Sequence, residues 1–205
     1  MSTIAITAKR HALGLPEGSI RATHTLLIVG LFCAMMLVDT RPPLAMPPYL
    51  IYLLFMVLGH YFAHRSGTRA GTTYHPLYLP RGCVRFLVMV GLVATIGWCL
   101  YHDPDKVQHQ FDESLEALKT EPLLPLFILG SFFLGVVVRA VVGRENPPYF
   151  LQDMEAWLSL VSIVGLAVAA VIHLIIQPSL ESTLHMPVWE AILASVISFY
   201  FGERS

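Results

Sequence analysis

Six apolar stretches, separated by short polar segments, dominate the hydropathy pattern of this 205-residue chain. The stretches cover residues 23–38, 48–64, 84–101, 122–142, 156–176 and 187–202. At 1.5 Å per residue the shorter stretches reach roughly 24–27 Å, just under the ~30 Å hydrocarbon core of a bilayer. Local thinning of the bilayer or flanking side chains can cover that difference. The pattern therefore predicts an all-α, polytopic membrane protein with six transmembrane helices in a single domain, 1–205.

Two polar segments interrupt or precede this pattern. Residues 1–12 form a polar N-terminal segment, and residues 102–121 form an acid-leaning loop. Within that loop Phe111, Leu115 and Leu118 recur at helical spacing. The spacing predicts a short amphipathic helix lying at the membrane surface.

The basic residues predict the orientation of the chain. If the N-terminus is cytoplasmic, ten Lys and Arg side chains fall in inner segments and three in outer segments. The inner ones are Lys9, Arg10, Arg21, Arg65, Arg69, Arg81, Arg85, Arg139, Arg144 and Arg204, and the outer ones are Arg41, Lys106 and Lys119. This asymmetry follows the positive-inside rule. It predicts a cytoplasmic (inner) membrane location with both termini inside and the loop 102–121 outside.

A short motif occurs twice, each time just before an apolar stretch. The chain reads L-G-L-P-E-G-S-I-R at 13–21 and L-Y-L-P-R-G-C-V-R at 77–85. The residues that match are Pro16, Gly18 and Arg21 in the first copy and Pro80, Gly82 and Arg85 in the second. We interpret the motif as a turn that sets an Arg at the cytoplasmic end of a transmembrane helix.

The motif and the aromatic helix ends suggest three in–out–in hairpins, covering 13–66, 77–142 and 149–205. Each hairpin crosses the membrane an even number of times, so the three would be parallel pseudo-repeats and not inverted ones. The alternative is that Pro-Gly turns and aromatic or Arg residues simply recur at membrane interfaces. The third hairpin lacks the motif.

The C-terminal F-Y-F-G-E-R-S, residues 199–205, resembles the tails of small bacterial membrane proteins, some of which are described as holin-like. The resemblance covers only these few residues. It implies a bacterial inner membrane and a holin-like pore component.

Composition agrees with a bilayer environment. Apolar residues make up 55% of the chain and charged residues 13%, whereas a soluble domain carries about 25% charged residues. The net charge of -1 gives no reason to expect a nucleic-acid partner. The three cysteines, Cys33, Cys83 and Cys99, have no metal-ligand spacing and predict neither a metal site nor a disulfide framework.

Small residues recur every four positions on several of the predicted helices. In lipid such faces allow close helix–helix approach and supply much of the attraction between helices. They either form contacts within one chain or mediate a homo-oligomer or a membrane complex. The faces are Gly30 and Ala34, Ser131 and Gly135, Gly165 and Ala169, and Ala194, Ser198 and Gly202.

Two groups of ionisable residues lie within the apolar stretches. His60 and His64 are one turn apart, at about the depth of His24, and histidines on facing helices could hold haem. His173 and Glu190 lie near the outer boundary on consecutive helices, where a costly ionisable group is expected to find a partner. A His173–Glu190 pair could pass protons or could be purely structural.

No catalytic motif is present in the sequence, so we expect a non-enzymatic protein without a resident cofactor. The leading hypothesis is a self-associating membrane assembly subunit, either a scaffold or a holin-like pore component. One alternative is a small channel or carrier that uses His173 and Glu190. The other is a haem-binding redox subunit that uses His24, His60 and His64.

Overall fold

The computed structural model describes residues 19–38, 46–63, 82–120, 123–142, 149–179 and 186–203. These ranges are helical apart from short connections, so the all-α prediction is confirmed for them. Part of the sequence analysis falls outside the described residues. This part comprises segment 1–12, Pro16, Gly18, Arg41, His64, Arg65, Arg69, Pro80, Arg81, Arg144 and Arg204.

Each predicted apolar stretch corresponds to one α-helix, and the polar segment between residues 102 and 121 contains another. The last turns of the helix that begins at Tyr149 continue as a π-helix, η3, and a 3₁₀ turn, η4. The elements are α1 Ser19–Leu37, α2 Pro48–Ala63, α3 Cys83–His102, α4 Pro104–Thr120, α5 Leu123–Val142, α6 Tyr149–Val171, η3 Ile172–Ile176, η4 Gln177–Ser179 and α7 Pro187–Glu203.

Four segments of the described chain are long and apolar enough to cross a membrane. They are Ser19–Leu37, Cys83–His102, Leu123–Val141 and Ala156–Ser179. The α2 and α7 helices are shorter, at 16 and 17 residues. The helices are therefore compatible with a multi-pass membrane protein, and the figure of six complete spans stays a prediction.

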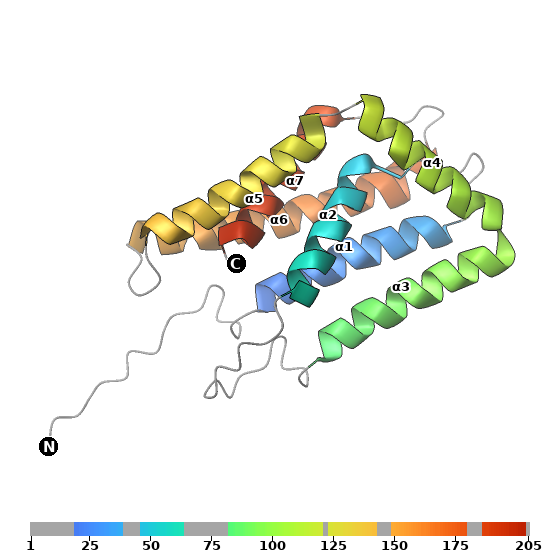
Figure 1. Ribbon diagram of the computed structural model, residues 1–205, viewed down its shortest axis with the longest axis horizontal. Coiled ribbons are helices and arrows are strands. Elements are labelled where there is room, and N and C mark those ends of the chain that lie inside the picture. Colours follow the sequence, from blue (N-terminus) through green and yellow to red (C-terminus); the bar gives the residue numbers. More distant parts are fainter. Residues whose placement is uncertain are drawn as a thin grey trace, which may run out of the picture.

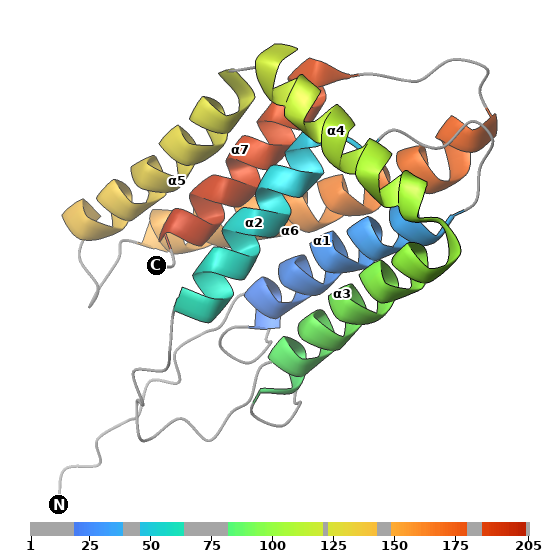
Figure 2. The same cartoon turned by 45° about the vertical axis from the view of Figure 1, so that its right-hand side comes forward.

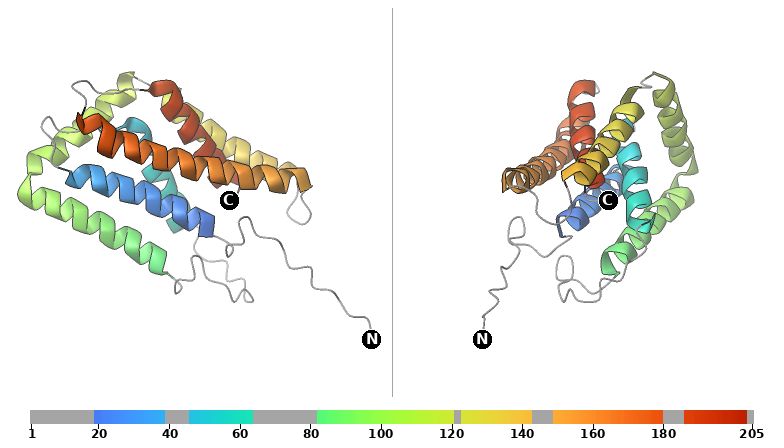
Figure 3. Two further views of the ribbon diagram at one scale, coloured as in Figure 1. Left: turned by 180° about the vertical axis from the view of Figure 1, so that it is seen from behind. Right: turned by 60° about the vertical axis from the view of Figure 1, so that its left-hand side comes forward.

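The six apolar helices form two layers of three. In one layer α1 lies between α3 and α6, and the three run nearly parallel (Figure 3). In the other layer α7 lies between α2 and α5 (Figure 2). The first helices of the predicted hairpins thus share one layer and the return helices share the other, although the repeat itself stays a prediction.

The α4 helix crosses one end of the bundle, leading from α3 towards α5 (Figure 1). Asp103 begins it, since its Oδ1 accepts a hydrogen bond of 3.2 Å from the backbone N–H of Lys106, as expected of an N-cap residue. The Nζ of Lys106 donates a 3.0 Å bond to the carbonyl of Val38 at the end of α1. We call this the α4 end of the bundle, where α2 and α7 begin and α1 and α6 end.

The motif that precedes α3 ends in a left-handed turn. Gly82 has φ 85°, a conformation that side chains rarely adopt, and its carbonyl accepts a 2.9 Å bond from the N–H of Phe86 in the first helical turn. This explains why glycine occupies that motif position. Arg21 and Arg85 lie half-buried near the opposite end of the bundle, at the starts of α1 and α3.

The tightest helix contact joins α5 and α7. A β-carbon added to Gly202 would collide with the backbone of Phe132, and one added to Gly135 would collide with the backbones of Phe199 and Glu203. Beside this contact the Nη1 of Arg139 donates a 2.7 Å bond to the carbonyl of Glu203 in the last turn of α7. Arg139 thus lies on the last turn of a neighbouring helix, where a cation is stabilising.

Large apolar side chains cover the outward surfaces of α3 and α5. Examples are Phe86, Val93, Phe127 and Phe133, each with more than half of its surface exposed. A soluble monomer rarely exposes so extended an apolar surface, whereas a lipid environment requires one. The exposed surface therefore agrees with the span lengths in favouring a membrane-embedded bundle.

Candidate functional site

A buried polar cluster lies at the α4 end of the bundle. Its titratable members are Tyr49 on α2, His173 in η3 and Glu190 in the first turn of α7, with 0%, 4% and 5% of their surfaces exposed. Both α2 and α7 begin at a proline, which suits the first helical position because its missing N–H would be unpaired there anyway. The prolines fix where the two helices start, and so place Tyr49 and Glu190 within their first turns.

The imidazole of His173 is held by its own helix. Its Nδ1 lies 2.7 Å from Oε1 of Gln177, and because a carbonyl oxygen only accepts, Nδ1 carries the hydrogen. His173 belongs to the π-helical segment, a local widening that is frequent at functional sites. The ring also packs against Tyr49, with centroids 6.2 Å apart. Nε2 is consequently the nitrogen of His173 left for exchange with other groups.

The sequence predicted a His173–Glu190 pair, and the structure brings both residues to the lining of one small cavity. The space open to the centre of a water molecule there is about 10 Å³, which is close to the minimum for holding one water. Tyr49 interacts electrostatically with Glu190, and its buried hydroxyl has no hydrogen-bond partner among the described residues. His173 and Glu190 therefore line a space of about one water molecule, and Tyr49 packs against the ring of His173.

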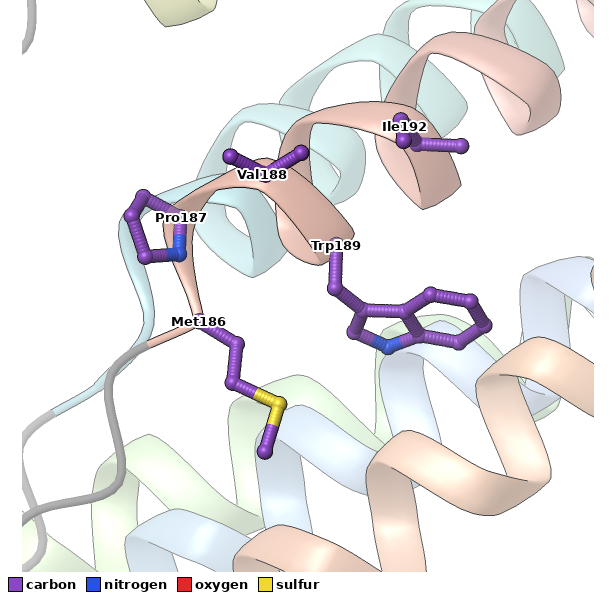
Figure 4. Close-up of a pocket in the computed structure, with 5 residues that line it drawn as sticks. All are labelled: Met186, Pro187, Val188, Trp189 and Ile192. Carbon is purple, nitrogen blue, oxygen red and sulfur yellow. The ribbon is translucent and has the colours of Figure 1, made fainter.

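Met186 and Trp189 separate this cavity from an open apolar hollow of about 430 Å³. Figure 4 shows their side chains extending to one side of α7, while Val188 and Ile192 extend to the other. The five residues that line the hollow carry no charged side chain. We call Met186 and Trp189 the wall of the cavity, because each lines both spaces.

A second polar cluster lies at the opposite end of the bundle, around His24 on α1. His24 is fully buried, and its Nδ1 donates a 2.9 Å bond to the carbonyl of Ile20. Its Nε2 lies 2.6 Å from Oγ of Ser162 on α6, and that hydroxyl also lies 3.0 Å from the carbonyl of Ser159. The ring of Tyr200 stacks on the imidazole at 5.2 Å.

These contacts bear on the predicted haem ligands. Both ring nitrogens of His24 are engaged, so ligation of iron by His24 would require one of these hydrogen bonds to break. His24 and His60 both pack against Phe201, at centroid distances of 6.3 and 5.3 Å. His64 lies outside the described residues, so the predicted set cannot be assembled from them.

The predicted small-residue faces have different surroundings. Ser131–Gly135 and Ala194–Gly202 pack against one another within the chain, and the hydroxyl of Ser198 donates a 2.9 Å bond to Sδ of Met56 on α2. A β-carbon on Gly165 would meet the side chain of Leu193, and Ala169 lines the small cavity. Gly30 is exposed, and an added β-carbon there would meet no described atom within 4 Å; Ala34 is half-buried.

Sequence reasoning missed Tyr49, Gln177 and Ser162. The sequence did carry a signal for Ser162 and Gln177, because the polar residues between positions 156 and 177 share a single helix face. That face reads Ser159, Ser162, Leu166, Ala169, His173 and Gln177, at steps of three or four residues. Each of the six side chains has at most 7% of its surface exposed. Tyr49 carried no such signal.

Comparison with models of protein families, with curated proteins and with solved structures finds no match to this chain.

Proposed function

We propose that this protein is a small proton channel or carrier in which Glu190, His173 and Tyr49 form the proton-binding site. The observation that carries the proposal is that the buried His173 and Glu190 line one water-sized cavity, with the buried Tyr49 against the His173 ring. Ionisable groups within a membrane are costly, and they commonly mark ion pathways and proton relays. Histidine adds a ring nitrogen that can accept or donate a proton.

Proton transfer through the site requires two groups that bind a proton and a bridge between them. Glu190 can take up a proton on its carboxylate and His173 on Nε2, because Nδ1 already carries a hydrogen bonded to Gln177. A water in the cavity would connect the two groups. Such a bridge exchanges protons without bringing either side chain into bulk solvent.

The proposed orientation follows from the basic residues, ten of which fall on the side of the two termini. In this orientation the α4 end faces outward from a cytoplasmic membrane. Glu190 then lies about one helical turn below the outer surface, with the wall of Met186 and Trp189 limiting access to it.

The test is proton flux into proteoliposomes that contain a trapped pH-sensitive dye, driven by a potassium diffusion potential. We expect the wild-type chain to carry protons and Glu190→Gln to lose at least about nine-tenths of that flux, equivalent to about 1.4 kcal/mol of barrier. Glu116→Gln is the matched control, because Glu116 is an exposed carboxylate on α4. It should retain the wild-type flux.

Two results would contradict the proposal. One is a wild-type flux no greater than that of protein-free vesicles. The other is a flux that Glu190→Gln leaves unchanged while the variant elutes as a folded protein.

Self-association as a scaffold or holin-like pore is the second candidate function. The outward-facing Gly30 on α1 favours it, since a neighbouring helix could approach closely there. The faces at Gly135 and Gly202 already contact each other within one chain. The mass measured in native nanodiscs should then correspond to more than one chain, and Gly30→Leu should lower it to the mass of one chain. A wild-type mass equal to one chain would exclude this candidate.

A further inference from the structure

Both polar clusters include residues of α6 with its continuation and residues of α7. On α6 and its continuation, Ser162 belongs to the His24 cluster and His173 to the Glu190 cluster. On α7, Glu190 belongs to one cluster and Tyr200 to the other. Ser162 and His173 are eleven positions apart, which is roughly 16 Å along a helix.

Between the clusters the buried side chains are mostly apolar, and the Ser198 hydroxyl there donates to Sδ of Met56. Each of the four surrounding helices contributes a fully or nearly fully buried aliphatic side chain one or two turns from its polar residue. These are Ile28 on α1, Leu53 on α2, Leu166 on α6 and Ile197 on α7, none more than 2% exposed. We call these four residues the apolar layer.

We propose that His24 and Ser162 form a second proton-binding site near the inner face, and that the apolar layer, which includes Leu166, is the barrier between the two sites. This inference rests on the proposed function, since it extends the Glu190 site into a path with two ends. Packed aliphatic side chains exclude the water that a proton would need to cross about 16 Å.

The hydrogen bonds at His24 accommodate an added proton. With neutral His24, Nδ1–H donates to the carbonyl of Ile20, and Nε2 accepts from the hydroxyl of Ser162. When Nε2 gains a proton it donates to Ser162 Oγ, and the Ser162 hydroxyl hydrogen turns to the carbonyl of Ser159 at 3.0 Å. No donor loses its partner in either state, and the Tyr200 ring remains stacked on the imidazole.

The experiment is Leu166→Ser in the proteoliposome flux assay. The substitution removes barrier volume and adds a hydroxyl, so we expect flux to rise by about tenfold, equivalent to about 1.4 kcal/mol. Leu160→Ser is the matched control, because Leu160 lies on the same helix but on its exposed side. It should leave the flux unchanged. Leu166→Ala provides a second, non-polar opening of the layer should the serine variant fold poorly.

The path is then tested by adding His24→Phe to Leu166→Ser. If His24 is the inner site, the double variant should return to the flux of the wild type or below it. A raised flux that depends on neither His24 nor Glu190 would mean a general leak and would overturn the inference. Equal flux in Leu166→Ser and Leu160→Ser would also overturn it, while a wild-type flux sensitive to Glu190→Gln would leave the proposed function intact.

Discussion

Gly135 on α5 and Gly202 on α7 let the two helix backbones meet directly. A β-carbon on Gly202 would lie 2.8 Å from the carbonyl carbon of Phe132, and one on Gly135 would lie 2.6 Å from the backbone nitrogen of Glu203. Real β-carbons essentially never approach other atoms so closely. Because backbone atoms form both sides of the contact, neither side can yield by changing a rotamer.

We therefore expect Gly202→Ala to destabilise the protein by about 1–3 kcal/mol, the usual range for inserting a methyl group into a well-packed contact. Gly130→Ala is the control on α5, since an added β-carbon there meets nothing within 4 Å. That control should be neutral or more stable, because alanine favours a helix over glycine by up to about 1 kcal/mol. Unfolding in mixed detergent measures both, and equal stability of the two variants would contradict the α5–α7 contact.

The hydrogen bond between His24 and Ser162 should appear as a coupling free energy. Such bonds average about 0.6 kcal/mol in membrane proteins and reach about 1.7 kcal/mol, and the 2.6 Å distance places this one among the shorter bonds. We expect Ser162→Ala and His24→Phe to cost less together than the sum of their separate costs. A double-mutant cycle of unfolding free energies measures the difference, and strict additivity would show that the two side chains do not interact.

Helix positions could be predicted from the sequence because lipid leaves an apolar segment of this length one way to satisfy its backbone. Helix partners could not be predicted in the same way. The spacing of Ser131 and Gly135, and of Ala194, Ser198 and Gly202, indicates that close contacts form but carries no information on which faces meet. Both a contact within one chain and an oligomer were compatible with that spacing, and the structure brings the two faces together within the chain.

The residues of the candidate site also differ in whether the sequence could predict them. Depth alone placed His173 and Glu190 near each other, and both line the same cavity. The Gln177 bond joins residues four positions apart, a spacing visible in the sequence, whereas the π-helical segment that contains His173 has no signature in one sequence. Tyr49 resembles any aromatic residue at a membrane interface until the fold shows its hydroxyl buried beside Glu190.

The wall of the cavity predicts how fast reagents reach Glu190. Dicyclohexylcarbodiimide is a lipid-soluble reagent that modifies protonated carboxyl groups, and Trp189 separates Glu190 from the apolar hollow through which it would arrive. We expect Trp189→Ala to raise the labelling rate of Glu190 several-fold, as followed by peptide mass. Trp98→Ala is the control, because Trp98 is an exposed residue on α3 and lines neither space. Equal rates in the two variants would show that Trp189 does not restrict access.

The sidedness of α4 tests the orientation from which the outer position of Glu190 was argued. Asp112 is exposed on α4, whereas Leu134 is exposed on the apolar surface of α5. In a chain whose three native cysteines are replaced by alanine, Asp112→Cys should react with an impermeant thiol reagent added to intact cells. Leu134→Cys should remain unlabelled even after the cells are opened, because lipid excludes the reagent.

The substitution His11→Cys provides the opposite test, since the positive-inside rule predicts a cytoplasmic N-terminal segment. This cysteine should react only after the cells are opened. If Asp112→Cys required opening and the N-terminal cysteine did not, the Glu190 cluster would face the cytoplasm and His24 the outside. The two sites would then exchange their proposed sides, while the apolar layer between them would keep its role as the barrier.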